Sequence, residues 1–198
     1  MTMPLLKRLA RSTRGATLVE FAIVTPLLLL LLLGGLETCH TMYVRSALVG
    51  SLQKAARDLS LEGASSSVRV NAITASVTDA VHQIMPAANV SLVAKSYHDY
   101  SNAANPAEEY NDADHDGRCD HGEAFVDSNR NGNWDVDGSV TGRGGARDVV
   151  LLVATASYNR LGLTALLPSA PQTVLTAKTL IRNQPNDQQA DPPTGYCS

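Results

Sequence analysis

Residues 14–36 read RGATLVEFAIVTPLLLLLLLGGL, and this stretch decides how the rest of the chain is organised. A basic segment, residues 7–14, precedes an apolar run from Phe21 to Leu36. With its flanking residues, the run reaches the roughly 20 residues that a helix needs to cross a bilayer. No comparable basic cluster follows the run. This asymmetry predicts a cytoplasmic N-terminus and an extracytoplasmic remainder.

Glu20 needs an explanation, because an ionised carboxylate close to hydrocarbon is costly unless a partner neutralises it. A secretory signal peptide would fit the basic and apolar segments, but residues 36–40, LETCH, lack the small residues of a cleavage site. A lipoprotein signal fits poorly, since Glu37 and Thr38 are unsuitable neighbours for a cut before Cys39. An uncleaved anchor explains the leucines and the arginines but leaves Glu20 unexplained.

A third interpretation explains all of these features. A cut between Gly15 and Ala16 would create a new ammonium group at Ala16 and make Glu20 the fifth residue of the mature chain. Residues four apart lie on one face of a helix, so the carboxylate can approach this ammonium or that of an adjacent subunit. Such a pair would neutralise both charges inside an apolar bundle.

A basic leader that ends in Gly15, a glutamate at the fifth mature position and an apolar helix resemble the class III signal of type IV pilins and pseudopilins. Residues 14–36 are similar to the TadE-like family of minor pseudopilins of the tight-adherence type IV pilus system. A weaker similarity lies between residues 125 and 185. The resemblance implies a structural protein without catalytic residues.

The resemblance also implies partners and a location. It implies processing by a prepilin peptidase, a single pass through the bacterial inner membrane and a periplasmic head. The expected role is to assemble or prime the pilus, together with other pilins or pseudopilins and the inner-membrane pilus machinery. Membership of the finished surface pilus is left open.

Composition and cysteine content limit the partners and the disulfides that the chain is expected to have. The net charge is −3, aromatic residues are few and no basic patch is present, which argues against a nucleic-acid partner. An extracytoplasmic location permits disulfides, and Cys119 with Cys197 is the preferred pair because both lie in the polar, loop-rich part. Cys39, at the outer end of the apolar helix, is expected to be a buried free thiol. The odd count leaves an intermolecular bond open.

Periodicity and composition divide the chain into four parts. They are a leader over 1–15, a long helix over 16–62 that spans the membrane to about residue 43, an extracytoplasmic head over 63–185 and a flexible tail over 186–198. Within the head, the apolar spacing predicts a helix over 68–85 and strands over 90–97, 148–158 and 173–182. The expected fold is α+β, with a small antiparallel sheet laid against the outer half of the long helix and a metal-binding-type loop.

An acidic loop over residues 110–138 carries the clearest chemistry, because it contains a short repeat at an offset of fifteen residues. Oxygen-bearing side chains stand at the first, third and fifth positions and glycine at the sixth, which is how a calcium loop begins. The first loop is a full match, with a main-chain carbonyl at the seventh position and a glutamate at the twelfth. Its predicted ligands are Asp112, Asp114, Asp116, Arg118, Asp120 and Glu123.

The second loop is a partial match. Its predicted ligands are Asp127, Asn129, Asn131, Asn133 and Asp135. Gly138 stands at the twelfth position, so this loop would be weaker or would be completed by a carboxylate from elsewhere. Only residues 124–126 separate the loops, which leaves no room for a helix and excludes an EF-hand pair.

Three alternatives stay open at this point. The loop could be a solvated acidic segment without an ion, or it could hold zinc through His115, Cys119 and His121. The protein could be a membrane-anchored calcium-binding adhesion or interaction module with no part in pilus assembly. A membrane-tethered hydrolase is disfavoured, because no nucleophile has a recognisable setting and the histidines share no motif.

Overall fold

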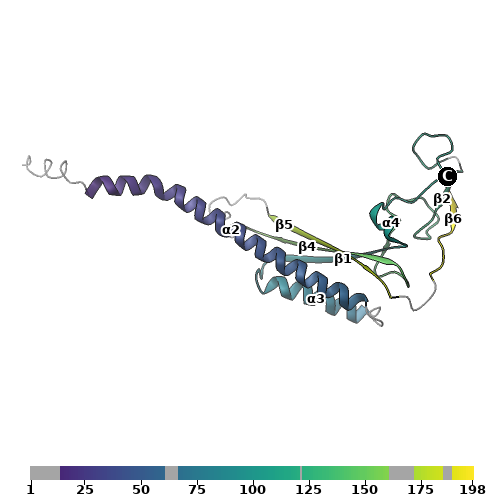
Figure 1. The fold of residues 1–198 in the computed structure, drawn as a ribbon, viewed down its shortest axis with the longest axis horizontal. Coiled ribbons are helices and arrows are strands. Elements are labelled where there is room, and N and C mark those ends of the chain that lie inside the picture. The colour runs from purple at the N-terminus through teal and green to yellow at the C-terminus, as the bar shows by residue number, and fades with distance from the viewer. Residues whose placement is uncertain (1–13, 61–66, 121, 161–171, 185–188) are drawn as a thin grey trace, which may run out of the picture. The chain divides into compact units, whose positions relative to one another are not determined.

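A computed structural model describes residues 14–60, 67–120, 122–160, 172–184 and 189–198 (Figure 1). The chain divides into two compact units, which are described separately here. The first contains Met1–Tyr43 with Arg160–Pro171, and the second contains Val44–Asn159 with Gln172–Ser198. The predicted leader lies almost wholly outside the described residues.

The first unit consists, in its described part, mainly of the beginning of helix α2, Arg14–Ser60. Leucine-rich sequence favours the helix, and the helix continues through Pro26, which cannot donate a backbone hydrogen bond. The Thr25 hydroxyl donates to the Phe21 carbonyl at 2.6 Å, and the Thr38 hydroxyl donates to the Gly34 carbonyl at 2.8 Å. The predicted helix over 16–62 is therefore present to within two residues at each end.

Among the described residues, α2 is the helix that is long and apolar enough to cross a membrane. No residue in the most apolar stretch of this helix is buried inside the structure. Leu18, Phe21, Ile23 and the leucines of residues 27–33 are all exposed. A helix with exposed apolar residues on all sides fits a lipid environment, which agrees with the predicted single-pass anchor.

The second unit is built on a four-stranded antiparallel sheet in the order β3-β1-β4-β5. Its strands are β1 Asn89–Tyr97, β3 Val140–Thr141, β4 Val149–Tyr158 and β5 Thr173–Arg182. The three long strands agree with the predicted ones to within one residue. The β1–β4 and β4–β5 ladders run without a break, with Leu92 opposite Ala154 and Ala154 opposite Ala177.

Two helical segments cover one face of this sheet: the outer part of α2, from Val44, and helix α3, Ser67–His82 (Figure 1). Side chains alternate across a strand, so every second residue of β4 reaches the helices. The core they form contains Val44, Leu48, Leu52, Ala55, Ala56, Leu59, Ile73, Val77, Val81, Val150, Leu152, Ala154, Ala156, Tyr158 and Ala177. The predicted arrangement, a small antiparallel sheet on the outer half of the long helix, is confirmed.

Several short elements were not predicted. Helix α4, Tyr100–Ala104, begins where the Asp99 side chain accepts a hydrogen bond from the Asn102 N–H. Strand β2, Ala124–Val126, pairs antiparallel with β6, Thr194–Tyr196. The end of the predicted flexible tail is therefore paired, and the prediction differs from the structure at these residues. Residues 186–188 of that tail lie outside the described residues.

Candidate metal-binding loops

The first acidic loop brings three carboxylates together. Ligand oxygens of Asp112, Asp114 and Asp116 all lie within 4.8 Å of one another. Both Asp112 oxygens turn inward, since Oδ1 accepts from the Asp116 N–H and Oδ2 from the Gly117 N–H, each at 3.1 Å. Gly117 has a φ of 77°, a conformation that glycine adopts without steric cost, so the turn depends on it.

Glu123, at the twelfth position, folds back over the start of the loop. Its Oε1 accepts from the Ala113 N–H at 2.6 Å, and its Oε2 accepts from the Asp120 N–H at 3.3 Å. The glutamate is buried. It therefore closes the loop by reaching the N–H groups of the second and ninth positions.

The second loop repeats this backbone conformation. Asp127 Oδ1 accepts from the Asn131 N–H at 3.0 Å, and Oδ2 accepts from the Gly132 N–H at 2.8 Å. Positive φ angles recur at the fourth position, 67° at His115 and 59° at Arg130. The sequence repeat is thus a structural repeat, and the two loops differ at their twelfth position.

Glu108 completes the second loop from upstream. Its Oε1 accepts from the Ser128 N–H at 2.8 Å, and its Oε2 accepts from the Asp135 N–H at 3.0 Å. These are the second and ninth positions of the second loop, the same positions that Glu123 reaches in the first. Only 2% of the Glu108 surface is exposed. Burial raises the pKa of this carboxyl above its ordinary value, although the backbone hydrogen bonds oppose the shift.

The side chain of Glu108 explains why residue 138 is a glycine. A Cβ at residue 138 would stand 2.7 Å from Glu108 Cγ and 3.0 Å from Oε1. The twelfth residue of the second loop can therefore carry no side chain, because the side chain of Glu108 occupies that space. The indole N–H of Trp134 donates to the Glu108 carbonyl at 2.8 Å and fixes the same residue from its backbone.

The remaining predicted ligands belong to the same two networks. Asp116 Oδ1 accepts from the Arg118 N–H at 2.8 Å. Asp135 Oδ2 accepts from the amides of Asn129 and Asn131 at 2.9 and 2.6 Å, and Asn131 Oδ1 accepts from the Asn133 N–H at 2.7 Å. The orientation of an Asn amide is assigned from such networks, so the same side chains can present oxygen to a cation.

The state of Cys119 decides whether the acidic loop can bind zinc. Cys119 is joined to Cys197 by a disulfide with a Cα–Cα distance of 5.5 Å, which is the pair preferred from the sequence. A disulfide sulfur is not a thiolate and cannot serve as the zinc ligand, so this alternative is excluded. Cys39 is free, but it is exposed rather than buried as expected. His121 lies outside the described residues.

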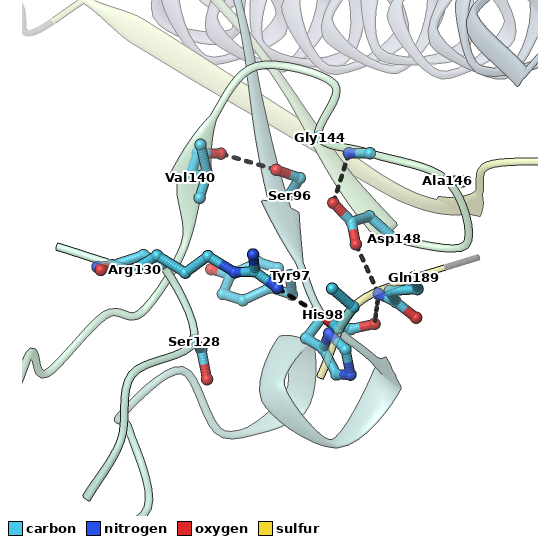
Figure 2. A pocket seen from close by; sticks show the side chains of 13 residues that line it. Ser96, Tyr97, His98, Ser128, Arg130, Val140, Gly144, Ala146, Asp148 and Gln189 are labelled. Atoms are coloured by element: carbon cyan, nitrogen blue, oxygen red, sulfur yellow. Dashed lines mark hydrogen bonds between the residues drawn. The ribbon is translucent and has the colours of Figure 1, made fainter. Parts of the chain in front are cut away.

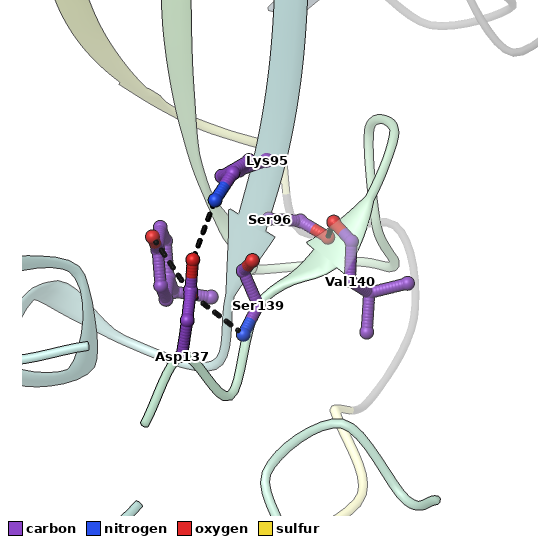
Figure 3. Close-up of polar contacts among 6 residues, drawn as sticks. Lys95, Ser96, Asp137, Ser139 and Val140 are labelled. Atoms are coloured by element: carbon purple, nitrogen blue, oxygen red, sulfur yellow. Dashed lines mark hydrogen bonds and ion pairs between the residues drawn. The ribbon is translucent and has the colours of Figure 1, made fainter. Parts of the chain in front are cut away.

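An ion pair fixes the end of the acidic loop to β1 (Figure 3). Lys95 Nζ lies 2.5 Å from Asp137 Oδ2, and the Tyr97 hydroxyl donates to Asp137 Oδ1 at 3.2 Å. Burial raises the pKa of Asp137, but the hydrogen bonds from Lys95 and Ser139 outweigh burial and hold the pKa below its ordinary value. The hydrogen bond to Asp137 raises the pKa of Lys95.

A pocket of about 420 Å³ lies beside the second loop (Figure 2). Its charged groups are engaged in holding chain segments together. Asp148 accepts from the Gly145 N–H and from the Gln189 amide, each at 2.6 Å, and Arg130 Nη2 donates to the carbonyls of Ala190 and Asp191 at 3.0 and 3.2 Å. The pocket is therefore a structural junction between the loop and the C-terminal segment.

Glu20 and the predicted cut site lie in α2. Gly15 and Ala16 fall in its first turn, and Glu20 is exposed among exposed apolar side chains such as Val19 and Phe21. The disulfide pair and the loop repeat predicted from the sequence are present in the structure, whereas the roles of Glu20 and of the cut site stay predictions, and Glu108 was missed. The signal for Glu108 was indirect, because a glycine at the twelfth position implied a carboxylate from elsewhere without saying which.

Comparison with known proteins matches the N-terminal part of the chain to a family. A family model described as TadE-like protein matches residues 15–57, which is the family expected from the sequence. No curated protein and no solved structure matches the chain. The match covers α2 almost to its end, so it bears on the membrane segment and the helix face of the core, and not on the acidic loops.

Proposed function

We propose that this chain, whose residues 15–57 are TadE-like, is a minor pseudopilin that takes part in assembling or priming a tight-adherence pilus. Its apolar helix would hold it in the bacterial inner membrane with the N-terminus in the cytoplasm and the head in the periplasm. A prepilin peptidase would cut between Gly15 and Ala16. Other pilins or pseudopilins and the inner-membrane pilus machinery would be its partners.

The observation that carries this proposal is the placement of Glu20. Glu20 lies among exposed apolar side chains, and no residue in the most apolar stretch of its helix is buried. A carboxylate that enters a membrane in this setting needs a counter-charge. The ammonium of a chain that begins at Ala16 lies four residues away on the same helix face, and the same group of a neighbouring subunit would serve equally.

N-terminal sequencing of the chain extracted from membranes of its native host tests the cut. The expected first residue is Ala16. An intact leader, or a start beyond Leu36, would contradict the proposal.

Glu20→Gln tests the pairing, because it removes the charge and keeps the size of the side chain. We expect pili to be lost, while the variant is still made and inserted in the membrane. The matched control is Glu109→Gln, an exposed carboxylate in the other unit, which should leave pili unchanged. Normal pilus formation with Glu20→Gln would contradict the assembly role.

A second candidate function is calcium binding by the head, and Glu108 is the observation that favours it. Both loops have a buried carboxylate at the same two backbone positions, although only one of the two lies at the twelfth position in the sequence. Calcium binds six to eight oxygens, which such loops provide. When bound, the ion would neutralise clustered carboxylates that otherwise repel one another.

In this proposal the first ion would be held by residues 112–123 and the second by residues 127–135 with Glu108. Calorimetric titration of the full chain in mild detergent should show two calcium ions per chain. Glu123→Gln and Glu108→Gln should each remove one, and Glu109→Gln should remove none. No binding at millimolar calcium, the upper range of extracellular modules, would overturn this candidate.

The two candidates are separable in the native host. If calcium only stabilises the head of a pseudopilin, Asp112→Ala with Asp116→Ala weakens pilus formation and Glu20→Gln abolishes it. If the chain is instead an anchored adhesion module, Glu20→Gln leaves pili intact. Calcium-dependent attachment is then lost only with the aspartate variants.

A further inference from the structure

We propose that the outer edge of β5 accepts an extended, acidic segment of another protein as an additional strand. β5 is the last strand in the order β3-β1-β4-β5, and no described residue pairs with its outer side. Edge strands present rows of unpaired N–H and C=O groups, and addition of a peptide strand to such an edge is a common mode of recognition.

The register shows which residues of β5 have outward N–H and C=O groups. The Asn183 N–H donates to the Asp148 carbonyl at 3.0 Å, in continuation of the β4–β5 ladder. Hydrogen-bonded pairs alternate along an antiparallel ladder. Odd-numbered residues of β5 therefore bond to β4, and the residues with outward backbone groups are Val174, Thr176, Lys178, Leu180 and Arg182.

This edge lacks most of the usual protection against pairing. All ten residues of β5 pair with β4 without a bulge, and the strand contains no proline. Its solvent face carries two large apolar side chains, Val174 at 61% exposure and Leu180 at 47%. A long, regular edge with exposed apolar groups is either a site of aggregation or a binding site for a partner strand.

Charge indicates the chemistry of the partner. Lys178 and Arg182 lie on the same solvent face as Val174 and Leu180, and they form no ion pair with any described residue. Opposite charges that face each other across two strands attract, and like charges repel. The fitting partner is a segment with acids opposite Lys178 and Arg182 and apolar residues opposite Val174 and Leu180.

A second copy of this chain fits the edge poorly. Antiparallel pairing of two β5 strands turns one copy end for end in the plane of the sheet. Pairing over nearly the full length of both strands, residues 174–182, would place Lys178 of one copy opposite Lys178 of the other, and like charges directly opposite each other are destabilising.

The probe is a fluorescent ten-residue peptide with Glu opposite Lys178 and Arg182, Val opposite Val174 and Leu180, and Thr elsewhere. We expect saturable binding to the full chain in mild detergent, measured by anisotropy. Thr176→Pro should abolish binding, because it removes an outward N–H and leaves the bonds to β4, as proline on an edge strand does. Thr176→Val is the matched control and should bind as well as the unchanged chain.

A charge exchange makes the test specific. Lys178→Glu should weaken binding roughly threefold to tenfold, and a peptide with Lys at the facing position should restore it. Unfolding followed by Trp134 fluorescence checks that each variant is folded. No binding, or equal binding to Thr176→Pro, overturns the proposal. Sedimentation that shows self-association lost in Thr176→Pro would identify a second copy as the occupant and overturn the assignment to another protein.

Discussion

Single side chains decide how the two acidic loops close. Glu123 and Glu108 do the same work in the two loops, but Glu123 is the twelfth residue of its own loop and Glu108 precedes both loops. The exchange requires a glycine at residue 138, where any side chain would collide with Glu108 Cγ at 2.7 Å.

Gly138→Ala should lower the free energy of unfolding of the head by about 1–3 kcal/mol, as overpacking of a filled site does. Gly138 does not have a positive φ, so the effect would be steric. The measurement is urea unfolding of the full chain in mild detergent, followed by the fluorescence of Trp134, whose indole donates to the Glu108 carbonyl.

Gly50→Ala is the matched control for this prediction. Nothing lies within 4 Å of a Cβ at Gly50, which is exposed in the interior of α2. The control should stabilise the chain by about 0.5–1 kcal/mol through helix propensity. Equal effects of the two substitutions would contradict the contact between Glu108 and Gly138.

The Lys95–Asp137 pair should contribute only about 0.5 kcal/mol at neutral pH, because its side chains are 39% and 35% exposed. Because the pKa of Asp137 is lowered in the folded state, the stabilisation from its negative charge is fully present above the ordinary carboxyl pKa. It is lost as pH falls through the folded pKa. Because the pKa of Lys95 is raised in the folded state, the stabilisation from its positive charge is fully present below the ordinary amine pKa. It is lost as pH rises through the folded pKa.

Urea midpoints across pH for the unchanged chain and for Lys95→Met check this prediction. The difference between the two should be largest between these two limits and should shrink at either end. A difference that is independent of pH would show that packing, and not charge, holds the end of the acidic loop to β1.

At the level of elements, β6 depends on the disulfide. β6 is three residues long and, among the described strands, pairs only with β2. Gly195 allows it to pass over the buried Phe125, since a Cβ there would stand 2.4 Å from the ring. Directly after β6, the Cys197 N–H donates to the Glu123 carbonyl at 2.8 Å, so this C-terminal segment also supports the first acidic loop.

Reduction of Cys119–Cys197 should release β6 while β1, β4 and β5 stay folded. Hydrogen exchange should show lost protection at Gly122 and Asp127, whose N–H groups donate to the Cys197 and Pro193 carbonyls at 2.9 Å. A bond between residues 78 apart restricts the unfolded chain by at most about 4.5 kcal/mol. Cys39→Ser, at a free and exposed cysteine, is the control and should change nothing.

For the whole molecule, the free energy of unfolding should depend on pH with opposite signs in the absence and in the presence of calcium. Burial raises the folded pKa of Glu108, so between the ordinary carboxyl pKa and the raised one the folded state holds more protons than the unfolded state. Without calcium, the free energy of unfolding should therefore fall as pH rises through this window. With millimolar calcium it should rise instead, because the ion binds the deprotonated carboxylates.

Thermal unfolding of the full chain across this window, with chelator and with calcium, measures both effects. Glu108→Gln should remove most of the pH dependence seen with chelator, and Glu109→Gln should leave it unchanged. The same pH dependence with and without calcium would argue against a cation in either loop.

The long apolar helix, the core-forming helix face, the three long strands and the loop repeat were predictable, because each depends on a pattern in contiguous residues. An apolar run, a spacing of three and four, an alternation of two and a repeat of fifteen residues are local patterns. The preferred disulfide followed from composition in the same way. The short strands β2, β3 and β6 carry too few residues to show a period.

By itself, the sequence determined the long apolar helix that contains Glu20, the α+β class and the identity of the loop residues, since these depend on neighbours along the chain. The tertiary structure alone decided that Glu108 completes the second loop, that β6 pairs with β2 and that β5 is left at the edge of the sheet. These features join residues far apart in sequence. Such contacts are selected by packing and by the pairing of buried polar groups, which leave no period in the sequence.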